Sequence, residues 1–463
     1  MWPLTQMRND GVRFSPRENS FTYTFPPPYF TSKRGLQRTP LSFTDGSLSG
    51  RLSLYLHIPF CEMDCSFCSL HRTTIHSSNM LKRYLSCLKL ELERLKELNV
   101  RASLDSVYIG GGTPTIYSAY ELGELLDAVG ATFIIAVDGV EVSLECAPST
   151  ARSYNEWRTY FNVLAGRKKL PVTRLSFGVQ TGDAASLRHM GRVGGEVAAL
   201  ALLRAADDMF ESYNADFLLN YPTISTRASL PRCEPSLLDW LDSCRASKLR
   251  LPSISLYQLW DVDTIPIGRA KHVNLLDEEK LLERKWTLQE GIFSRKLAPA
   301  LISTVVQESR HASAFFKNRH SSFCQIGCGS GAYSIFPREF VTRPRNIEEY
   351  MLACEEGPVF NTMSSCYNLT HEETEIRRLI MGLRSFEWID ASLLAETECK
   401  SFVSLGETVG RIQNLVTLGL VLKDKKKFRF SDDAFLIGNE LSTYLHPSSH
   451  SRRAEYNGGQ SIS

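Results

Sequence analysis

The sequence predicts an α/β protein whose parallel sheet is wound as a partial (β/α)6, TIM-like barrel. From residue 51 onward, short apolar runs alternate with segments of helical length, and about six such units follow one another. This alternation is typical of parallel sheets whose strands are connected by helices. A proline- and aromatic-rich stretch precedes the units, and a helical stretch with a basic hairpin follows them. We therefore expect a barrel with an N-terminal arm and a small helical, winged-helix-like C-terminal domain.

The expected strands are short and bounded by turn residues. They cover 53–58, 105–109, 139–146, 172–179, 213–219 and 252–259. The expected helices cover 79–98, 118–129, 150–165, 183–209, 235–248 and 277–295. In the first of them, leucines recur every three or four residues, which marks one buried helix face. Catalytic and binding residues of such sheets lie at the C-terminal ends of the strands.

The chain is expected to divide into five segments. These are an N-terminal extension (1–50), the barrel (51–300), a connecting segment that completes the active site (301–365), the C-terminal domain (366–446) and a flexible tail (447–463). The aromatic residues around Pro26, Pro27 and Pro28 favour an extended arm docked on the barrel over a loose leader. Helices are expected at 372–383, 393–405 and 408–418. The lysines at 425–427 are typical of a solvated turn, so nucleic acid is not an expected partner.

The composition is that of an ordinary globular protein. Hydrophobic residues make up 43% of the 463 residues, and the formal charge of +2 provides no overall field for nucleic acid or a membrane surface. Twelve scattered cysteines fit reduced thiols rather than a disulfide scaffold. The sequence shows neither a signal peptide nor a membrane span. We expect a cytoplasmic protein without a membrane partner.

Three cysteines lie within eight residues directly after the first expected strand. Cys61, Cys65 and Cys68 have the spacing C-x3-C-x2-C. Thiolates are ligands for iron–sulfur clusters, zinc or copper(I), and three of them on a four-iron cluster leave one iron open. The alternatives are a zinc site completed by His57 or His71, or ordinary buried cysteines. The spacing favours the cluster only modestly.

Polar residues also gather where the other strands are expected to end. The turn 110–115 contains three consecutive glycines, which let the backbone approach a ligand and offer N–H groups to it. Polar side chains at or near the following strand ends are Glu145, Gln180, Arg192 and Asp216. Each has an ordinary explanation, such as a surface ion pair for Glu145. Together they place polar groups at one rim of the barrel, where a binding site is expected.

These motifs carry a resemblance to a known family. The run 54–61 with its cysteines, the glycine turn 110–115, and the stretches 141–148, 174–180 and 327–334 resemble radical S-adenosylmethionine enzymes. More narrowly, they resemble the branch of the oxygen-independent coproporphyrinogen III oxidases and haem chaperones. The similarity spans about residues 51 to 440, and the five motifs occur in the family's order.

The resemblance implies a cofactor site. The three cysteines would hold a [4Fe-4S] cluster, and S-adenosylmethionine would chelate its open iron. Reductive cleavage would then release a 5′-deoxyadenosyl radical. The remaining residues that match family positions at the cofactor are Tyr55, Phe67, Gly111, Gly112, Thr113, Glu145, Gln180, Arg192 and Asp216. Tyr55 would lie beside the cluster or the sulfonium as the catalytic residue, and Phe67 beside the adenine.

Departures from the family pattern guide the expected reaction. Leu70 stands where the oxidase has a fourth cysteine, the text from His320 to Cys324 lacks the chaperone's haem-binding signature, and Asn220-Tyr221-Pro222 replaces Gly-Leu-Pro. These differences favour a class C methyltransferase or cyclopropanase acting on an sp2 carbon of a natural-product or tetrapyrrole substrate. The alternatives are oxidative decarboxylation of a porphyrinogen, or haem carriage without turnover.

A methyltransferase of this class uses two molecules of S-adenosylmethionine. Family precedent places the second near three glycines, Gly327, Gly329 and Gly331, for which a structural turn is an equally good explanation. The expected partners are a small-molecule substrate and a reductant such as flavodoxin or ferredoxin.

Overall fold

The computed structural model describes most of the chain. It covers residue 9 and residues 50–98, 102–148, 152–192, 195–219, 233–258, 278–320, 324–358, 365–390 and 403–448. The predicted N-terminal arm, the Asn220-Tyr221-Pro222 segment and the tail after residue 448 lie outside these ranges.

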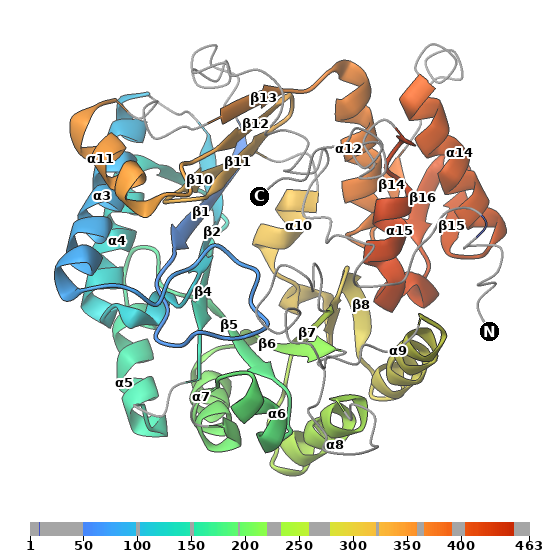
Figure 1. Ribbon diagram of the computed structural model, residues 1–463, viewed down its shortest axis with the longest axis horizontal. Coiled ribbons are helices and arrows are strands. Elements are labelled where there is room, and N and C mark those ends of the chain that lie inside the picture. Colours follow the sequence, from blue (N-terminus) through green and yellow to red (C-terminus); the bar gives the residue numbers. More distant parts are fainter. Residues whose placement is uncertain are drawn as a thin grey trace.

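Six parallel strands form the centre of the molecule (Figure 1). They follow one another in chain order as β1 (Arg51–Ile58), β2 (Ser103–Gly111), β4 (Glu141–Cys146), β5 (Arg174–Gln180), β6 (Ser212–Leu219) and β7 (Ser253–Gln258). Their bounds agree within a few residues with the predicted strands, so the predicted partial barrel is confirmed. In β1, Leu52, Leu54 and Leu56 are fully buried in the main hydrophobic core. The alternate residues of each strand face the other side of the sheet.

The connecting helices also match the prediction. They are α3 (Ser78–Glu97), α4 (Ala119–Thr132), α5 (Tyr154–Ala165), α6 (Ala184–His189), α7 (Gly195–Met209), α8 (Cys233–Ala246) and α9 (Glu278–Phe293). Capping boxes start α4 at Ser118 and α5 at Ser153. The single helix predicted for 183–209 is instead two helices, because Gly191 turns the chain with a φ of +77° after α6.

The segment that the sequence left unassigned extends the sheet at both edges. Beside β7 lies the antiparallel β9 (Thr304–Val306), and β8 (Ala298–Leu301) pairs in turn antiparallel to β9. At the other edge β10 (Cys324–Cys328) runs parallel to β1. The edge continues through antiparallel β11 (Tyr333–Phe336), β12 (Glu339–Thr342) and β13 (Ser365–Asn368), with α11 (Ile347–Glu356) between the last two. The short β3 (Ile134–Ile135) pairs with β2.

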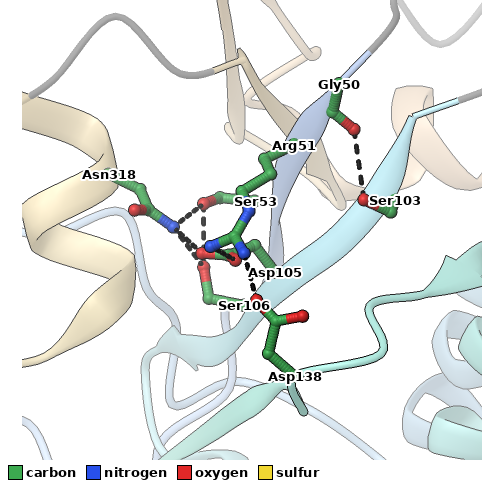
Figure 2. Close-up of polar contacts among 8 residues, drawn as sticks. All are labelled: Gly50, Arg51, Ser53, Ser103, Asp105, Ser106, Asp138 and Asn318. Carbon is green, nitrogen blue, oxygen red and sulfur yellow. Dashed lines mark hydrogen bonds and ion pairs between the residues drawn. The ribbon is translucent and has the colours of Figure 1, made fainter.

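A short helix, α10 (Ala314–His320), contacts the first strands of the barrel and lies between them and the C-terminal helices (Figure 1). At the N-terminal ends of the strands, Asn318 donates to Asp105 Oδ2 (2.6 Å) and to Ser53 Oγ (3.2 Å). Arg51 pairs with Asp105 and Asp138 in the same network (Figure 2). These contacts fix α10 against β1 and β2.

The C-terminal part contains the hairpin and the helices expected at 372–383 and 408–418, the second of which already begins at Val403. Its elements are α12 (His371–Leu383), β14 (Ile389–Asp390), α14 (Val403–Thr417), β15 (Val421–Asp424), β16 (Lys427–Phe430) and α15 (Gly438–Tyr444). The three strands form a separate antiparallel sheet. Most of the helix predicted at 393–405 lies outside the described residues. In the described part of the chain, no helix has the length and apolar character needed to cross a membrane.

Candidate active site

The loop after β1 gathers the three cysteines at the C-terminal end of the barrel strands. The loop is held by backbone hydrogen bonds from Thr73 N to Pro59 O (2.7 Å) and from Cys61 N to Thr73 O (2.9 Å). A turn closed by Cys68 N and Cys65 O (3.2 Å) brings the second and third thiols onto one segment. Cys61 and Cys65 are buried, whereas Cys68 is half-buried. The loop therefore presents three thiols near one another without exposing all of them to water.

The thiols of Cys61 and Cys65 combine burial with nearby cationic groups. Burial raises the pKa of the Cys61 and Cys65 thiols, which disfavours free thiolates. Arg72 and Arg192 lower the pKa of Cys65, so cationic groups for bound thiolates lie close by. Among the described residues, no three His, Cys, Asp or Glu side chains are gathered as a single metal ion requires. In a cubane each thiolate binds a different iron.

The predicted glycine turn packs directly on this loop. Gly112 N donates to Ile58 O (2.7 Å), and Thr113 N donates to Phe60 O (2.8 Å). The Thr113 hydroxyl contacts Cys61 Sγ at 3.6 Å. A Cβ on Gly112 would lie 2.5 Å from Phe60 O, so only glycine allows this approach. The turn therefore lies directly against the cysteine loop, and its predicted approach to a ligand stays a prediction.

Two half-buried carboxylates lie at the same rim, Glu145 on β4 and Asp216 on β6, with β5 between these two strands. The Glu145 side chain accepts hydrogen bonds from Tyr108 Oη (2.8 Å) and Gly111 N (2.9 Å). Asp216 accepts from Asn214 Nδ2 (2.6 Å) and Ser176 Oγ (3.2 Å). Burial raises the pKa of both acids, and the nearby Glu145 adds to the shift that brings the Asp216 pKa to about 7. Two carboxylates that oppose each other in this way favour a cationic ligand.

Arg192, Phe67 and Gln180 meet on the side of the loop that faces β5. The Arg192 guanidinium lies over the Phe67 ring, 5.7 Å from its centroid. Gln180 ends β5 at a register shift with a φ of +70°, a conformation that is uncommon for a non-glycine residue. A Cβ on Gly178 would lie 2.2 Å from Gln180 Nε2 and 3.1 Å from Arg192 Nη2. Gly178 therefore makes room for both side chains, and all three predicted residues lie together.

Tyr55 occupies the inner face of β1 below the cysteine loop. Its ring stacks on Tyr108, with 6.2 Å between the ring centroids, and its hydroxyl lies 2.9 Å from His57 Nδ1. His57 Nε2 lies 3.0 Å from His71 O, so both ring nitrogens of His57 have hydrogen-bond partners. Burial lowers the pKa of His57 to about 3, and His57 therefore stays neutral. These contacts give His57 a structural role and do not support the zinc alternative.

The three downstream glycines lie beside β1. Gly327 lies in β10 opposite Tyr55, and a Cβ there would be 2.2 Å from Tyr333 O. Gly329 and Gly331 have φ values of +101° and +72°. Close packing and backbone conformation thus explain why these positions are glycine. Their predicted contact with a second cofactor stays a prediction.

Sequence reasoning missed several residues that shape the site. Tyr108 and Asn214 bind the two predicted carboxylates, and Ser176 supports Asn214 and Asp216. Phe315 and Phe316 of α10 pack against Tyr108. The strand residues could have been found from the period of two, because Tyr108 precedes Gly110 and Asn214 precedes Asp216 by two positions. For α10 the sequence carries no comparable signal.

Comparisons with known proteins agree with this site. Residues 55–227 match the model of the radical SAM superfamily. The chain is 25% identical over 403 residues to the protein named haem chaperone HemW of Bacillus subtilis, covering 84% of this chain and 97% of that one. It is 24% identical over 406 residues to the oxygen-independent coproporphyrinogen III oxidase of Bradyrhizobium diazoefficiens, covering 85% and 86%.

A solved structure shares the fold. The coproporphyrinogen III oxidase HemN of Escherichia coli, described as a radical SAM enzyme, superposes with a TM-score of 0.75. It is 19% identical to this chain, and the match covers 96% of this chain and 99% of that one. These relatives favour the oxidase and chaperone alternatives and do not support the methyltransferase that the sequence departures favoured.

Proposed function

For a chain that carries a radical SAM domain and resembles the HemW and coproporphyrinogen oxidase branch, we propose a protein that binds a [4Fe-4S] cluster and S-adenosylmethionine and acts on a tetrapyrrole. Cys61, Cys65 and Cys68 would hold three irons of the cluster. S-adenosylmethionine would occupy the open iron. In this proposal the tetrapyrrole is haem as cargo or a porphyrinogen as substrate.

One observation carries the cofactor assignment. The three thiols follow β1, the glycine turn ends β2, and the half-buried carboxylates Glu145 and Asp216 lie on β4 and β6 of the same sheet. Thr113 contacts Cys61 directly. S-adenosylmethionine carries a sulfonium and an ammonium group, which match a rim that carries the half-buried carboxylates Glu145 and Asp216. The donor set of three soft thiolates fits an iron–sulfur cluster. The residues present therefore fit both groups.

The chain's own residues bind, orient and exclude water. Glu145 and Asp216 bind the cationic part of the ligand, and Arg192 stacks on Phe67 beside the thiols. Tyr55 and Tyr108 cover the inner side of the site with aromatic rings. When bound, the cluster and S-adenosylmethionine supply reductive cleavage of a carbon–sulfur bond and a carbon-centred radical. A buried, ring-lined site of this kind keeps water away from such chemistry.

Our first candidate function is haem carriage, in which the protein binds haem without changing it chemically. The relative that is named a haem chaperone matches over 97% of its length. A second argument is the missing fourth cysteine. The oxidases that this chain resembles have that cysteine two positions after the third, and here the position is Leu70, which is 48% exposed. Oxidative decarboxylation of a porphyrinogen is the second candidate, since the named oxidase matches over 86% of its length.

Three product assays on anaerobically prepared, cluster-loaded protein separate the candidates. Haem carriage predicts stoichiometric haem binding by absorption spectroscopy, with no change of the tetrapyrrole by mass spectrometry. Oxidative decarboxylation predicts that a porphyrinogen loses carbon dioxide and two hydrogens per propionate. One hydrogen atom goes to 5′-deoxyadenosine, and an added electron acceptor takes up the remaining electron. Formation of S-adenosylhomocysteine and transfer of a labelled methyl group would instead support the methyltransferase function that the sequence departures favoured. Failure to bind or change any tetrapyrrole would contradict the proposed ligand class.

The electron donor and the cellular location expected from the sequence are also part of this proposal. A reductant of the flavodoxin or ferredoxin kind would supply the electron for cleavage. A cytoplasmic location is our expectation. Imaging of the tagged chain together with an organelle marker tests it directly.

A further inference from the structure

Tyr108 is a buried residue of β2 that the sequence analysis did not identify as part of the site. Its side chain lies two residues before the glycine turn and is 3% exposed. Its hydroxyl donates a hydrogen bond of 2.8 Å to Glu145 Oε1. Gly111 N donates to Glu145 Oε2 at 2.9 Å. Each oxygen of this carboxylate therefore has its own donor, and the plane of the carboxylate is fixed.

We propose, on the basis of the function proposed above, that Tyr108 is a positioning residue that aims the Glu145 carboxylate at the cationic part of S-adenosylmethionine. Tyr108 acts through Glu145 and does not itself touch the cofactor in this proposal. Gly110 supports the pair, because a Cβ there would lie 2.8 Å from Tyr108 Cε1 and 2.8 Å from Glu145 Cδ. A side chain at this position would push the two groups apart.

The ring of Tyr108 is held on several sides. It stacks on Tyr55 with ring planes 26° apart and lies 4.9 Å from Phe315 and 5.2 Å from Phe316, measured between ring centroids. Both phenylalanines belong to α10, whose N-terminus is capped by the Glu141 carboxylate through Ala314 N (2.9 Å). The network of Figure 2 holds the other end of α10 through Asn318. The hydroxyl of Tyr108 therefore has a fixed direction.

The hydrogen bond also controls the charge of Glu145. Burial raises the pKa of Glu145, and the donors Tyr108 and Gly111 lower it. The other titratable groups on the surrounding elements are Tyr55 and His57 on β1, Arg174 on β5, Asp216 on β6, Tyr257 on β7 and Arg192 after α6. Of these, Asp216 changes charge near neutral pH, and its titration is coupled to that of Glu145. Loss of the Tyr108 hydroxyl should let Glu145 keep its proton to higher pH.

The test is the pH dependence of cofactor affinity in the Tyr108→Phe variant. S-adenosylmethionine is titrated calorimetrically into anaerobic, cluster-loaded protein between about pH 6 and about pH 8.5. We expect affinity about tenfold weaker near the acidic end, an alkaline shift of the profile by about one pH unit, and a difference that narrows at high pH. Combining Tyr108→Phe with Glu145→Gln should add no further shift to that of Glu145→Gln alone.

Tyr213→Phe is the matched control. This tyrosine is equally buried, lies on β6, and bonds Asp207 and Leu251 away from the barrel interior. Its variant should keep the wild-type profile. An unchanged profile in Tyr108→Phe overturns the inference, and so does an equal loss of affinity at every pH, which indicates a structural role alone. If cluster-loaded wild-type protein does not bind S-adenosylmethionine, the proposed function fails instead.

Discussion

At the scale of single residues, the site combines groups whose protonation is set by burial. Cys61 and Cys65 have raised pKa values because their loop shields them from water. Asp216 has a pKa near 7 because it is buried and lies close to Glu145. Burial makes the charged form of each of these groups unfavourable, and a bound metal or cation would make the charged form favourable again. Binding of a metal to the thiols, or of a cation to Asp216, is therefore expected to release protons and to strengthen as pH rises.

The first prediction concerns Asp216. Its pKa rises from the ordinary value of 3.8 to about 7 on folding, so between these values the folded protein holds a proton that the unfolded chain has lost. The free energy of unfolding should therefore fall as pH rises through this window, by at most about 1.4 kcal/mol per pH unit, and level off above about pH 7. The Asp216→Asn variant should lack this contribution.

Urea unfolding of both proteins across this pH range, without S-adenosylmethionine, measures the difference. Added S-adenosylmethionine should reduce the slope of the wild type by favouring ionised Asp216. A wild-type minus variant difference that does not change with pH would contradict the assignment of the raised pKa to Asp216.

At the scale of elements, the glycine loop after β10 is tied to α3 by one buried carboxylate. Glu91 of α3 accepts from Arg343 Nε (2.7 Å), Tyr350 Oη (2.7 Å) and Gly329 N (3.0 Å). Glu91 and Arg343 are both fully buried. Two helices, α3 and α11, and the segments that follow β10 and β12 thus meet at one buried ion pair.

The second prediction is that Glu91→Gln destabilises the fold by about 3 to 5 kcal/mol. The substitution keeps the volume but leaves the Arg343 charge buried without its partner. Chemical unfolding measures the loss, and hydrogen exchange should rise at residues 329–331. The control is Glu124→Gln, which breaks an exposed ion pair between Glu124 of α4 and Lys89, a residue of the same helix as Glu91. It should change the free energy of unfolding little. Equal effects of the two variants would contradict the role given to Glu91.

The site elements differ in how far the sequence could predict them. The six parallel strands β1, β2, β4, β5, β6 and β7 were predictable because their apolar runs and turn residues are local signals, whereas the two-residue β3 was not predicted. The loop with Cys61 and the turn with Gly112 were likewise predictable, because each follows its strand directly. Helix α10 was not, since its seven residues carry no periodicity and its place depends on Glu141 and Asp105, which lie far away in sequence.

At the scale of the whole molecule, the C-terminal part is joined to the barrel by buried polar contacts. Lys285 of α9 forms an ion pair with Glu440 of α15 at 2.5 Å, and the two side chains are 3% and 1% exposed. Gln289 Oε1 of α9 also accepts a hydrogen bond from Leu436 N of the C-terminal part at 3.3 Å. Figure 1 shows α12, α14 and α15 grouped on one side of the barrel. Pairs between such distant segments have no local sequence signal.

The third prediction is that barrel and C-terminal part unfold together. Lys285→Met should cost about 3 to 5 kcal/mol, because it leaves Glu440 charged and buried. The double variant Lys285→Met/Glu440→Leu should recover most of the loss, since neither charge remains. Asp242→Asn, which breaks the more exposed pair with Arg295, should have little effect. Two separate unfolding transitions in the wild type would contradict this coupling.

The most direct test of the central claim is electron paramagnetic resonance of anaerobically prepared, dithionite-reduced protein with and without S-adenosylmethionine. The wild type should contain about four irons per chain and give a cluster signal that changes when S-adenosylmethionine binds the open iron. Cys65→Ala should lose the iron and the signal, whereas Cys244→Ala, which removes a buried thiol of α8, should keep both. A Cys65→Ala protein that retains the iron and responds to S-adenosylmethionine would contradict the account.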